Sequence, residues 1–311
     1  MIKFLKDRKN EWAIYGLLLL AFFALIALAV LVQDGAPYES IALDLGFAQV
    51  AWYAVFILTG ITIAAVIAYL EFKRVGWNPD ELLDALLIAV PLSIVGSRLY
   101  YVAFDPDPNY NSLLDVINLT NGGLSIHGAV ITAFAFVIVW TKIKKKNFWI
   151  LADILAVGFL VGQIIGRWGN FMNAEAYGPI VQNSFIFDIL PAFIKDQMYI
   201  AGAFRHPTFL YEGFWNFAGL IFLLIARRKR WFKVGDMMGL YLFWYGLGRG
   251  AIIEPLRTQG HPTDALRVFG LPANILFSLT LFMLGGIAII VVKHLMIKDQ
   301  KYYVDMLVNE A

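Results

Sequence analysis

The polar side chains best suited to chemistry occur in one short run, Gly166–Gly178, directly after an apolar segment. This run contains Arg167, Asn170, Asn173 and Glu175. An arginine guanidinium suits bidentate binding of a phosphate or carboxylate, and asparagine amides can hydrogen-bond hydroxyls or backbone around such a ligand. Because ionisable groups at membrane depth are costly and usually face a cavity, the run predicts a functional site.

Three other clusters combine glycine with polar or aromatic side chains. A glycine-rich turn, 121–128, places His127 and Gly128 at the start of another apolar segment. A functional histidine and one satisfied by a neighbouring carbonyl fit this position equally well. The other two clusters supply, in chain order, His206, Glu212, Tyr245, Arg249, Glu254 and Arg257. On a continuous helix Arg249 and Arg257 would lie about two turns apart on one side.

The elements that position these residues are predicted to be transmembrane helices. With 60% hydrophobic and 15% charged residues, the composition is too apolar for a soluble globule. Glycine recurs every fourth residue from Gly158 to Gly166, which predicts close packing of another helix. The chain is therefore predicted to be an all-α integral membrane protein, a multi-pass bundle of about eight helices with a small outer-face cap at 175–206. The expected spans are Trp12–Val32, Gly46–Leu70, Leu82–Phe104, Gly123–Trp140, Trp149–Gly166, Thr208–Ala226, Met237–Ile253 and Phe269–Val292.

The first span has a basic start and could instead be a cleaved signal peptide. Its apolar stretch exceeds the roughly 7–15 residues of a signal-peptide core, which favours a retained helix.

Most of the 25 lysines and arginines fall on alternate loops, which predicts that both termini are cytoplasmic. The net charge of +2 hides this sidedness and does not indicate nucleic-acid binding. The basic residues left on the outer side are Arg98, Arg167, Lys195, Arg205, Arg249, Arg257 and Arg267. Simple pairing with acidic residues of the outer loops is the expected role of Lys195, Arg205 and Arg267.

The sequence excludes several kinds of chemistry. The chain has no cysteine, so it has no disulfide and no thiolate nucleophile of its own. Its four histidines are too scattered for a metal motif, and neither a Walker loop nor a dinucleotide glycine pattern is present. We therefore expect no metal and no cofactor.

Taken together, the four clusters resemble the signature of bacterial prolipoprotein diacylglyceryl transferases. The run Gly166-Arg-x-Gly-Asn-Phe-x-Asn-x-Glu-x-x-Gly178 is the most specific part of the likeness. The clusters 122–128, 206–212 and 245–249 also resemble that family and occur along the chain in its order. Trp52-Tyr53 and the segment around Arg98 also resemble its early helices, and the likeness covers roughly 42–292.

The resemblance implies transfer of the diacylglyceryl group of phosphatidylglycerol to the lipobox cysteine of a prolipoprotein signal peptide, with release of glycerol phosphate. It also implies a bacterial cytoplasmic membrane protein whose site faces outward. His127, Arg167 and Arg249 are the expected catalytic residues, with His127 either the general base or a group that only positions lipid. The expected substrate-binding residues are Tyr53, Arg98, Gly128, Asn170, Asn173, Glu175, Gly178, His206, Glu212, Tyr245, Glu254 and Arg257.

This chain departs from the family pattern in two places. Residues 1–41 read as an added helix and outer linker before the transferase-like region 42–292, and 293–311 reads as a cytoplasmic tail. The family's arginine and glutamate in the seventh span are usually four apart, whereas Arg249 and Glu254 are five apart. Either a one-residue bulge realigns the turn, or the roles of Glu254 and Arg257 have shifted.

Three other classes of protein are alternatives to this transferase. A lipid or organic-anion transporter could use the outer arginines as an entry site, but the missing internal repeat argues against it. An intramembrane serine protease is disfavoured because Ser125 is only two residues from His127. A purely structural membrane anchor would not need charged clusters on one face.

Overall fold

The computed structural model describes residues 9–46, 49–105, 112, 116, 123–182, 185–260, 267–268 and 270–308. The chain forms two compact units. Unit 1 comprises Met1–Ile67 and Leu155–Asp305, and unit 2 comprises Ala68–Ile154 and Met306–Ala311.

Within the described residues, seven helical runs are long and apolar enough to cross a membrane. The predicted class, an all-α multi-pass membrane protein, is therefore confirmed. The seven runs are α2 (Lys9–Leu31), α3 (Trp52–Arg74), α4 (Asp80–Ala103), α6 (Ile126–Ile143), α7 (Phe148–Met172), α10 (Thr208–Ala226) and the composite α13–η2–α14 (Ala273–Phe277, Ser278–Leu284, Gly285–Met296).

The eighth expected span, Met237–Ile253, is present as part of a segmented helical run rather than one uniform helix. α11 (Asp236–Gly248) passes into a π-helical turn, η1 (Arg249–Ile253), and then into α12 (Glu254–Gly260). A π turn accommodates one extra residue by closing hydrogen bonds from i to i+5. α11 alone has 13 residues, too few to cross a bilayer as a single α-helix.

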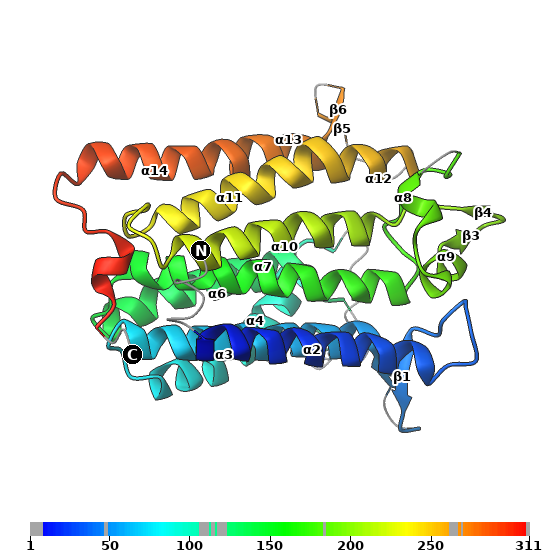
Figure 1. Ribbon diagram of the computed structural model, residues 1–311, viewed down its shortest axis with the longest axis horizontal. Helices are drawn as coiled ribbons and strands as arrows, with labels where there is room; N and C mark the ends of the chain where they lie inside the picture. Colours follow the sequence, from blue (N-terminus) through cyan, green and yellow to red (C-terminus); the bar gives the residue numbers. More distant parts are fainter. Residues whose placement is uncertain are drawn as a thin grey trace. The chain divides into compact units, whose positions relative to one another are not determined.

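Small residues let helices approach closely inside unit 1. A Cβ at Gly60 of α3 would lie 3.4 Å from the Cα of Gly162 on α7, in the middle of the predicted glycine row. A Cβ at Gly239 of α11 would lie 2.8 Å from the carbonyl oxygen of Gly286 on α14. Figure 1 shows α10, α11 and α14 running lengthwise beside one another.

The segment expected as a cap is folded where the structure describes it. Two short helices, α8 (Phe185–Asp188) and α9 (Ala192–Gln197), precede a hairpin of β3 (Tyr199–Ile200) and β4 (Ala203–Phe204). The side chain of Gln197 is buried and donates to the carbonyl oxygens of Phe171 and Met172 at 3.0 and 3.3 Å. These are orphan carbonyls at the end of α7, so the cap also completes that helix.

The remaining elements are small. They are the hairpin of β1 (Ile41–Asp44) and β2 (Gln49–Ala51), the hairpin of β5 (Arg267–Val268) and β6 (Leu271–Pro272), and the 3₁₀ helix η3 (Tyr303–Met306).

Candidate active site

The polar run begins inside a helix, not after it. We expected the fifth span to end near Gly166, but α7 continues to Met172, so Arg167 and Asn170 lie in its last two turns. The stretch contains no proline that would stop it. The helix ends just beyond, where Ala174 adopts a positive φ of 47°. Both polar side chains are therefore fixed by helical backbone.

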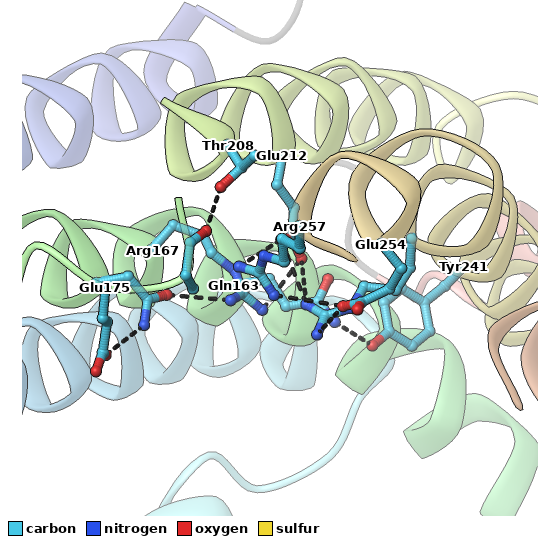
Figure 2. Close-up of polar contacts among 11 residues, drawn as sticks. Gln163, Arg167, Glu175, Thr208, Glu212, Tyr241, Glu254 and Arg257 are labelled. Atoms are coloured by element: carbon cyan, nitrogen blue, oxygen red, sulfur yellow. Dashed lines mark hydrogen bonds and ion pairs between the residues drawn. The ribbon is translucent and has the colours of Figure 1, made fainter. Parts of the chain in front are cut away.

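The carboxylate of Glu212 is the centre of the site. Glu212 lies in the first turns of α10 and its side chain is only 2% exposed. One carboxylate oxygen lies 3.1 Å from Arg167 Nη2 and 3.3 Å from Arg249 Nη1. The other lies 3.5 Å from Arg257 Nη2. Figure 2 shows the labelled Arg167, Glu212 and Arg257 side chains converging on one another.

A second carboxylate, from Glu254, joins two of these arginines. It lies 2.5 Å from Arg249 Nη2 and 3.4 Å from Arg257 Nη1. The π turn η1 occupies the five residues from Arg249 to Ile253 and so accounts for the five-residue spacing of Arg249 and Glu254. Of the two alternatives raised by that spacing, the structure has the bulge.

We call Arg167, Glu212, Arg249, Glu254 and Arg257 the arginine cluster. Three cations and two anions leave it one positive charge. The arginine side chains are 11–19% exposed, so most of their surface is removed from water. Charge interactions are stronger at such a site than in bulk water. A group of this kind can bind a phosphate monoanion and can stabilise additional negative charge on it.

An amide chain extends the cluster toward the end of α7. Arg167 Nη1 donates to Asn170 Oδ1 at 3.1 Å, and Asn170 Nδ2 donates to Glu175 Oε1 at 2.7 Å. Asn173 Nδ2 reaches the same Glu175 oxygen at 3.3 Å. Glu175 therefore reaches Arg167 through Asn170, and the carboxylate in direct contact with Arg167 is that of Glu212.

Two expected tyrosines line this region. Tyr245 stacks on Tyr241 with ring centroids 6.1 Å apart, and the Tyr241 hydroxyl accepts a hydrogen bond from Gln163 Nε2 at 2.8 Å (Figure 2). The ring of Tyr53 lies against Gly169, where a Cβ would come within 2.2 Å of it. Glycine is therefore required at position 169 for the α3 tyrosine to reach this part of α7.

Gly178 and His206 join the cap to the start of α10. Gly178 N donates to His206 O at 2.9 Å, and His206 N donates to Pro179 O at 3.0 Å. The imidazole Nδ1 of His206 lies 2.9 Å from the Tyr211 hydroxyl, and burial lowers the pKa of His206. These contacts hold backbone beside Glu212, so the two residues have at least a structural role.

The glycine-rich turn belongs to unit 2, whereas the arginine cluster belongs to unit 1. Arg98 of α4 donates through Nε to Val116 O at 2.8 Å and through Nη1 to Gly123 O at 3.2 Å, so its described contacts hold backbone. A Cβ at Gly128 would lie 2.4 Å from Gly96 O, so α4 and α6 are in close contact there. His127 is exposed at the start of α6. Its ring stacks on Tyr100 at 6.0 Å. Asn121 and Gly122 of the motif lie outside the described residues.

Lys195 and Arg205 were expected to pair with acidic side chains, but their described contacts are of other kinds. Lys195 Nζ donates to the backbone carbonyl of Asp188 at 3.1 Å, and the Arg205 guanidinium lies 5.5 Å from the Tyr177 ring centre. The side chain of Arg267 lies outside the described residues.

Sequence reasoning missed Gln163 and Tyr241, which are hydrogen-bonded to each other, with Tyr241 stacked on the expected Tyr245. The signals were present: Gln163 is polar within an apolar helix, and Tyr241 precedes Tyr245 by one helical turn. It also missed Thr208, whose hydroxyl donates to Ala176 O and ties α10 to the end of the polar run (Figure 2). Among the residues the structure describes, no three His, Asp or Glu side chains are grouped to hold a metal ion.

Comparison with known proteins places these features in a wider context. The sequence model of prolipoprotein diacylglyceryl transferase matches residues 40–292, a range that contains the whole arginine cluster. Curated phosphatidylglycerol–prolipoprotein diacylglyceryl transferases of Streptococcus pneumoniae, from strain Hungary19A-6 and from the serotype 2 strain D39, are each 41% identical to the chain over 267 residues. That alignment covers 86% of this chain and 97% of each relative.

Proposed function

Because the chain belongs to the prolipoprotein diacylglyceryl transferase family, we propose that it transfers the diacylglyceryl group of phosphatidylglycerol to the lipobox cysteine of prolipoproteins. The observation that supports this assignment best is the arginine cluster, which combines three arginines from separate helical elements with one net positive charge. A single anionic phosphodiester matches that charge.

The reaction is a displacement at carbon. The cysteine thiolate attacks the glycerol carbon that carries the phosphate ester, and a carbon–sulfur bond forms as the carbon–oxygen bond breaks. The bonding electron pair leaves on the phosphate oxygen, and glycerol phosphate departs. Negative charge therefore grows on the phosphate in the transition state, and preorganised cations at that position lower the barrier.

Arg167 and Arg249 are the groups that we assign to the phosphate. Both are held by ion pairs to carboxylates while 19% of each side chain stays exposed, so their direction is fixed before lipid arrives. Asn170 and Asn173 are assigned to the headgroup glycerol. Glu212, expected among the substrate-binding residues, is 2% exposed, so we propose that it acts on the lipid indirectly, as the counterion that gathers the arginines.

The tyrosines and the second ion pair complete the proposed binding site. Tyr53 and Tyr245 are proposed to donate hydroxyl hydrogen bonds to phosphate oxygens. Glu254 and Arg257 hold Arg249 in place through the contacts at 2.5 and 3.4 Å that Glu254 makes with the two arginines.

The thiol must lose its proton for this step. A free cysteine thiol has a pKa near 8.5 and a free imidazole one near 6.5, so a histidine is a reasonable proton acceptor. We propose His127 for this role. The absence of cysteine from the chain fits the assignment, since the nucleophile arrives with the peptide substrate.

We place the protein in the bacterial cytoplasmic membrane, with both termini in the cytoplasm and the arginine cluster at the outer face. The basic loops on alternate sides support this orientation. The Arg227–Lys233 segment lies at the opposite end of α10 from Glu212. On this arrangement the cap rests against the outer leaflet, where its exposed Phe185 and Ile189 would meet lipid.

The test is direct. The purified protein is incubated with phosphatidylglycerol vesicles and a lipobox peptide, and the peptide is analysed by mass spectrometry for a diacylglyceryl adduct. A peptide with Cys→Ser is the substrate control. Arg249→Ala is expected to abolish transfer while the protein stays folded in the membrane. Arg230→Ala, whose side chain is 68% exposed at the other end of unit 1, is expected to keep it.

Absence of the adduct with the native chain would refute the assignment. Near-native transfer by Arg249→Ala would remove phosphate binding from the role of that residue.

A further inference from the structure

The first helix of this chain, α2, lies outside the region matched by the family, 40–292, yet one of its faces is buried in unit 1. Its buried residues are Glu11, Phe22, Ile26 and Ala29, whose spacing places them on one stripe of the helix. Phe23, next to Phe22, is 55% exposed. A free transmembrane anchor would have no such stripe, so α2 is a packed part of unit 1.

At its first turn, α2 makes a buried ion pair with the far end of α10. Glu11 Oε1 lies 3.0 Å from Arg228 Nη2 and 3.5 Å from Arg227 Nη2, and both arginine side chains are 1% exposed. Arg227 and Arg228 directly follow α10, the helix that carries Glu212. One end of α2 is therefore fixed to that helix.

In its middle, α2 contacts an aromatic cluster formed by side chains of α7 and α10. The ring of Phe22 packs edge-on against Trp168 at 6.2 Å, and Trp168 packs edge-on against Phe209 of α10 at 5.3 Å. Phe171 contacts both Trp168 and Phe209, at 5.4 and 4.9 Å. Trp168 follows Arg167 in sequence. This cluster is thus the junction that sets α7 against α10.

The linker after α2 contacts the same aromatic cluster through Tyr38. The ring of Tyr38 lies 5.9 Å from Phe171, and the backbone N–H of Tyr38 donates to Gln197 Oε1 at 2.7 Å. Gln197 in turn donates to the last carbonyls of α7. Two aromatic rings of the junction, Phe22 and Tyr38, are therefore supplied by the segment that the family match does not include.

We propose that the N-terminal segment Lys9–Tyr38 positions α7 against α10, through Phe22 and Tyr38, and so holds Arg167 on Glu212 for the transfer reaction. This inference rests on the proposed function. The segment touches none of the reacting groups, so Phe22 and Tyr38 are positioning residues. Its effect is expected on the rate of transfer and on lipid binding, and not on recognition of the peptide.

The decisive comparison uses two neighbouring phenylalanines on α2. Phe22→Ala removes the ring behind Trp168, whereas Phe23→Ala removes an equal ring from the exposed face. Because small displacements of a catalytic group are costly, we expect Phe22→Ala to lower kcat/KM for phosphatidylglycerol about tenfold, with the KM for the peptide within about twofold of native. Phe23→Ala should match the native chain, and Phe22→Leu should recover most of the loss.

Each variant is normalised to its folded fraction by size-exclusion chromatography in detergent, which separates loss of protein from loss of rate. The rise in Tm on adding phosphatidylglycerol is measured in parallel, because ligand binding raises apparent stability without requiring chemistry. Native kinetics and a native lipid-induced rise in Phe22→Ala, or equal losses in Phe22→Ala and Phe23→Ala, would overturn the inference.

A native chain that binds lipid but does not lipidate the peptide would instead refute the proposed function, and the rise in Tm would still test the inference. A native chain that shows neither would refute both.

A charge exchange tests the other end of the segment. Glu11→Arg places three arginines together and should lower activity per folded molecule. Adding Arg228→Glu restores the same three charges with the pair reversed, and activity should return to within about threefold of native, since the direct contact is re-formed. Failure of the exchange to improve on Glu11→Arg would show that this contact does not fix α2 for catalysis.

Discussion

The role of Glu212 as a counterion can be tested by changing the charge of the arginine cluster one unit at a time. Glu212→Gln keeps the size of the side chain but removes the carboxylate that contacts all three arginines at 3.1–3.5 Å. The cluster charge rises from +1 to +2, and Glu254 pairs only with Arg249 and Arg257. Arg167 then has no carboxylate among the ion pairs described.

Breaking a buried ion pair costs about 3–5 kcal/mol. The arginines here keep 11–19% exposure, so we take the lower figure, about 3 kcal/mol. For a unit of this size that corresponds to a decrease in apparent Tm of about 6–12 °C. The assay is thermal unfolding in detergent, followed by tryptophan fluorescence, with transferase activity measured on the same samples. Activity is expected to fall with stability, because Arg167 is released.

The double variant Glu212→Gln, Arg257→Gln gives the sharper result. It returns the cluster to +1, so its Tm should lie above that of Glu212→Gln although a second native side chain is lost. Glu175→Gln is the matched control: this carboxylate is exposed and meets only amides, so its effect should stay within about 0.5 kcal/mol. A double variant less stable than Glu212→Gln would refute the charge-balance reasoning.

Three further outcomes are expected. Arg167→Lys should lower transfer about 100-fold, measured by adduct mass spectrometry, since a lysine cannot reproduce the fork that meets carboxylate and phosphate together; a native rate would contradict the assignment. His127→Asn should lower the rate and remove the rise of activity with pH that a general base produces, whereas retention of most of the rate would reject that role. Gly169→Ala should impair activity and lower Tm, because its Cβ would lie 2.2 Å from the ring of Tyr53, while Gly166→Ala, with nothing within 4 Å, should unfold at or above the native temperature.

The membrane fold was predictable because hydropathy over about 20 residues is set by the bilayer and not by distant contacts. Seven of the eight expected spans correspond to helical runs of sufficient length. Met237–Ile253 was harder, since a π turn changes the hydrogen-bond pattern without changing the apolar composition. The end of α7 was predicted too early because a charged, glycine-containing run is typical of a helix end. In the structure Arg167 and Asn170 continue the helix. Their side-chain polar groups are satisfied by each other and, for Arg167, by Glu212 of α10.

The residues of the site were easier to identify than their partners. Arg167, Glu212 and Arg249 each belong to a motif that local sequence reveals. That one carboxylate lies between three arginines depends on how α7, α10 and η1 pack, and no spacing along the chain encodes it. The same holds for Phe22, which looks like any apolar residue of a transmembrane helix until the contact with Trp168 is known.

The π turn at Arg249–Ile253 has a consequence for how sequences of this family are aligned. An amino acid inserted into an α-helix rotates everything after it by about 100°, which would carry Glu254 and Arg257 away from Glu212. A π turn absorbs the insertion locally, so the side chains on either side keep their orientation. Deleting one residue between Arg249 and Glu254 should therefore shorten the turn to an α-helical one and leave the ion pairs standing. In a sequence alignment, a gap therefore belongs inside this turn, because Glu254 and Arg257 keep their positions in the arginine cluster when its length changes by one residue.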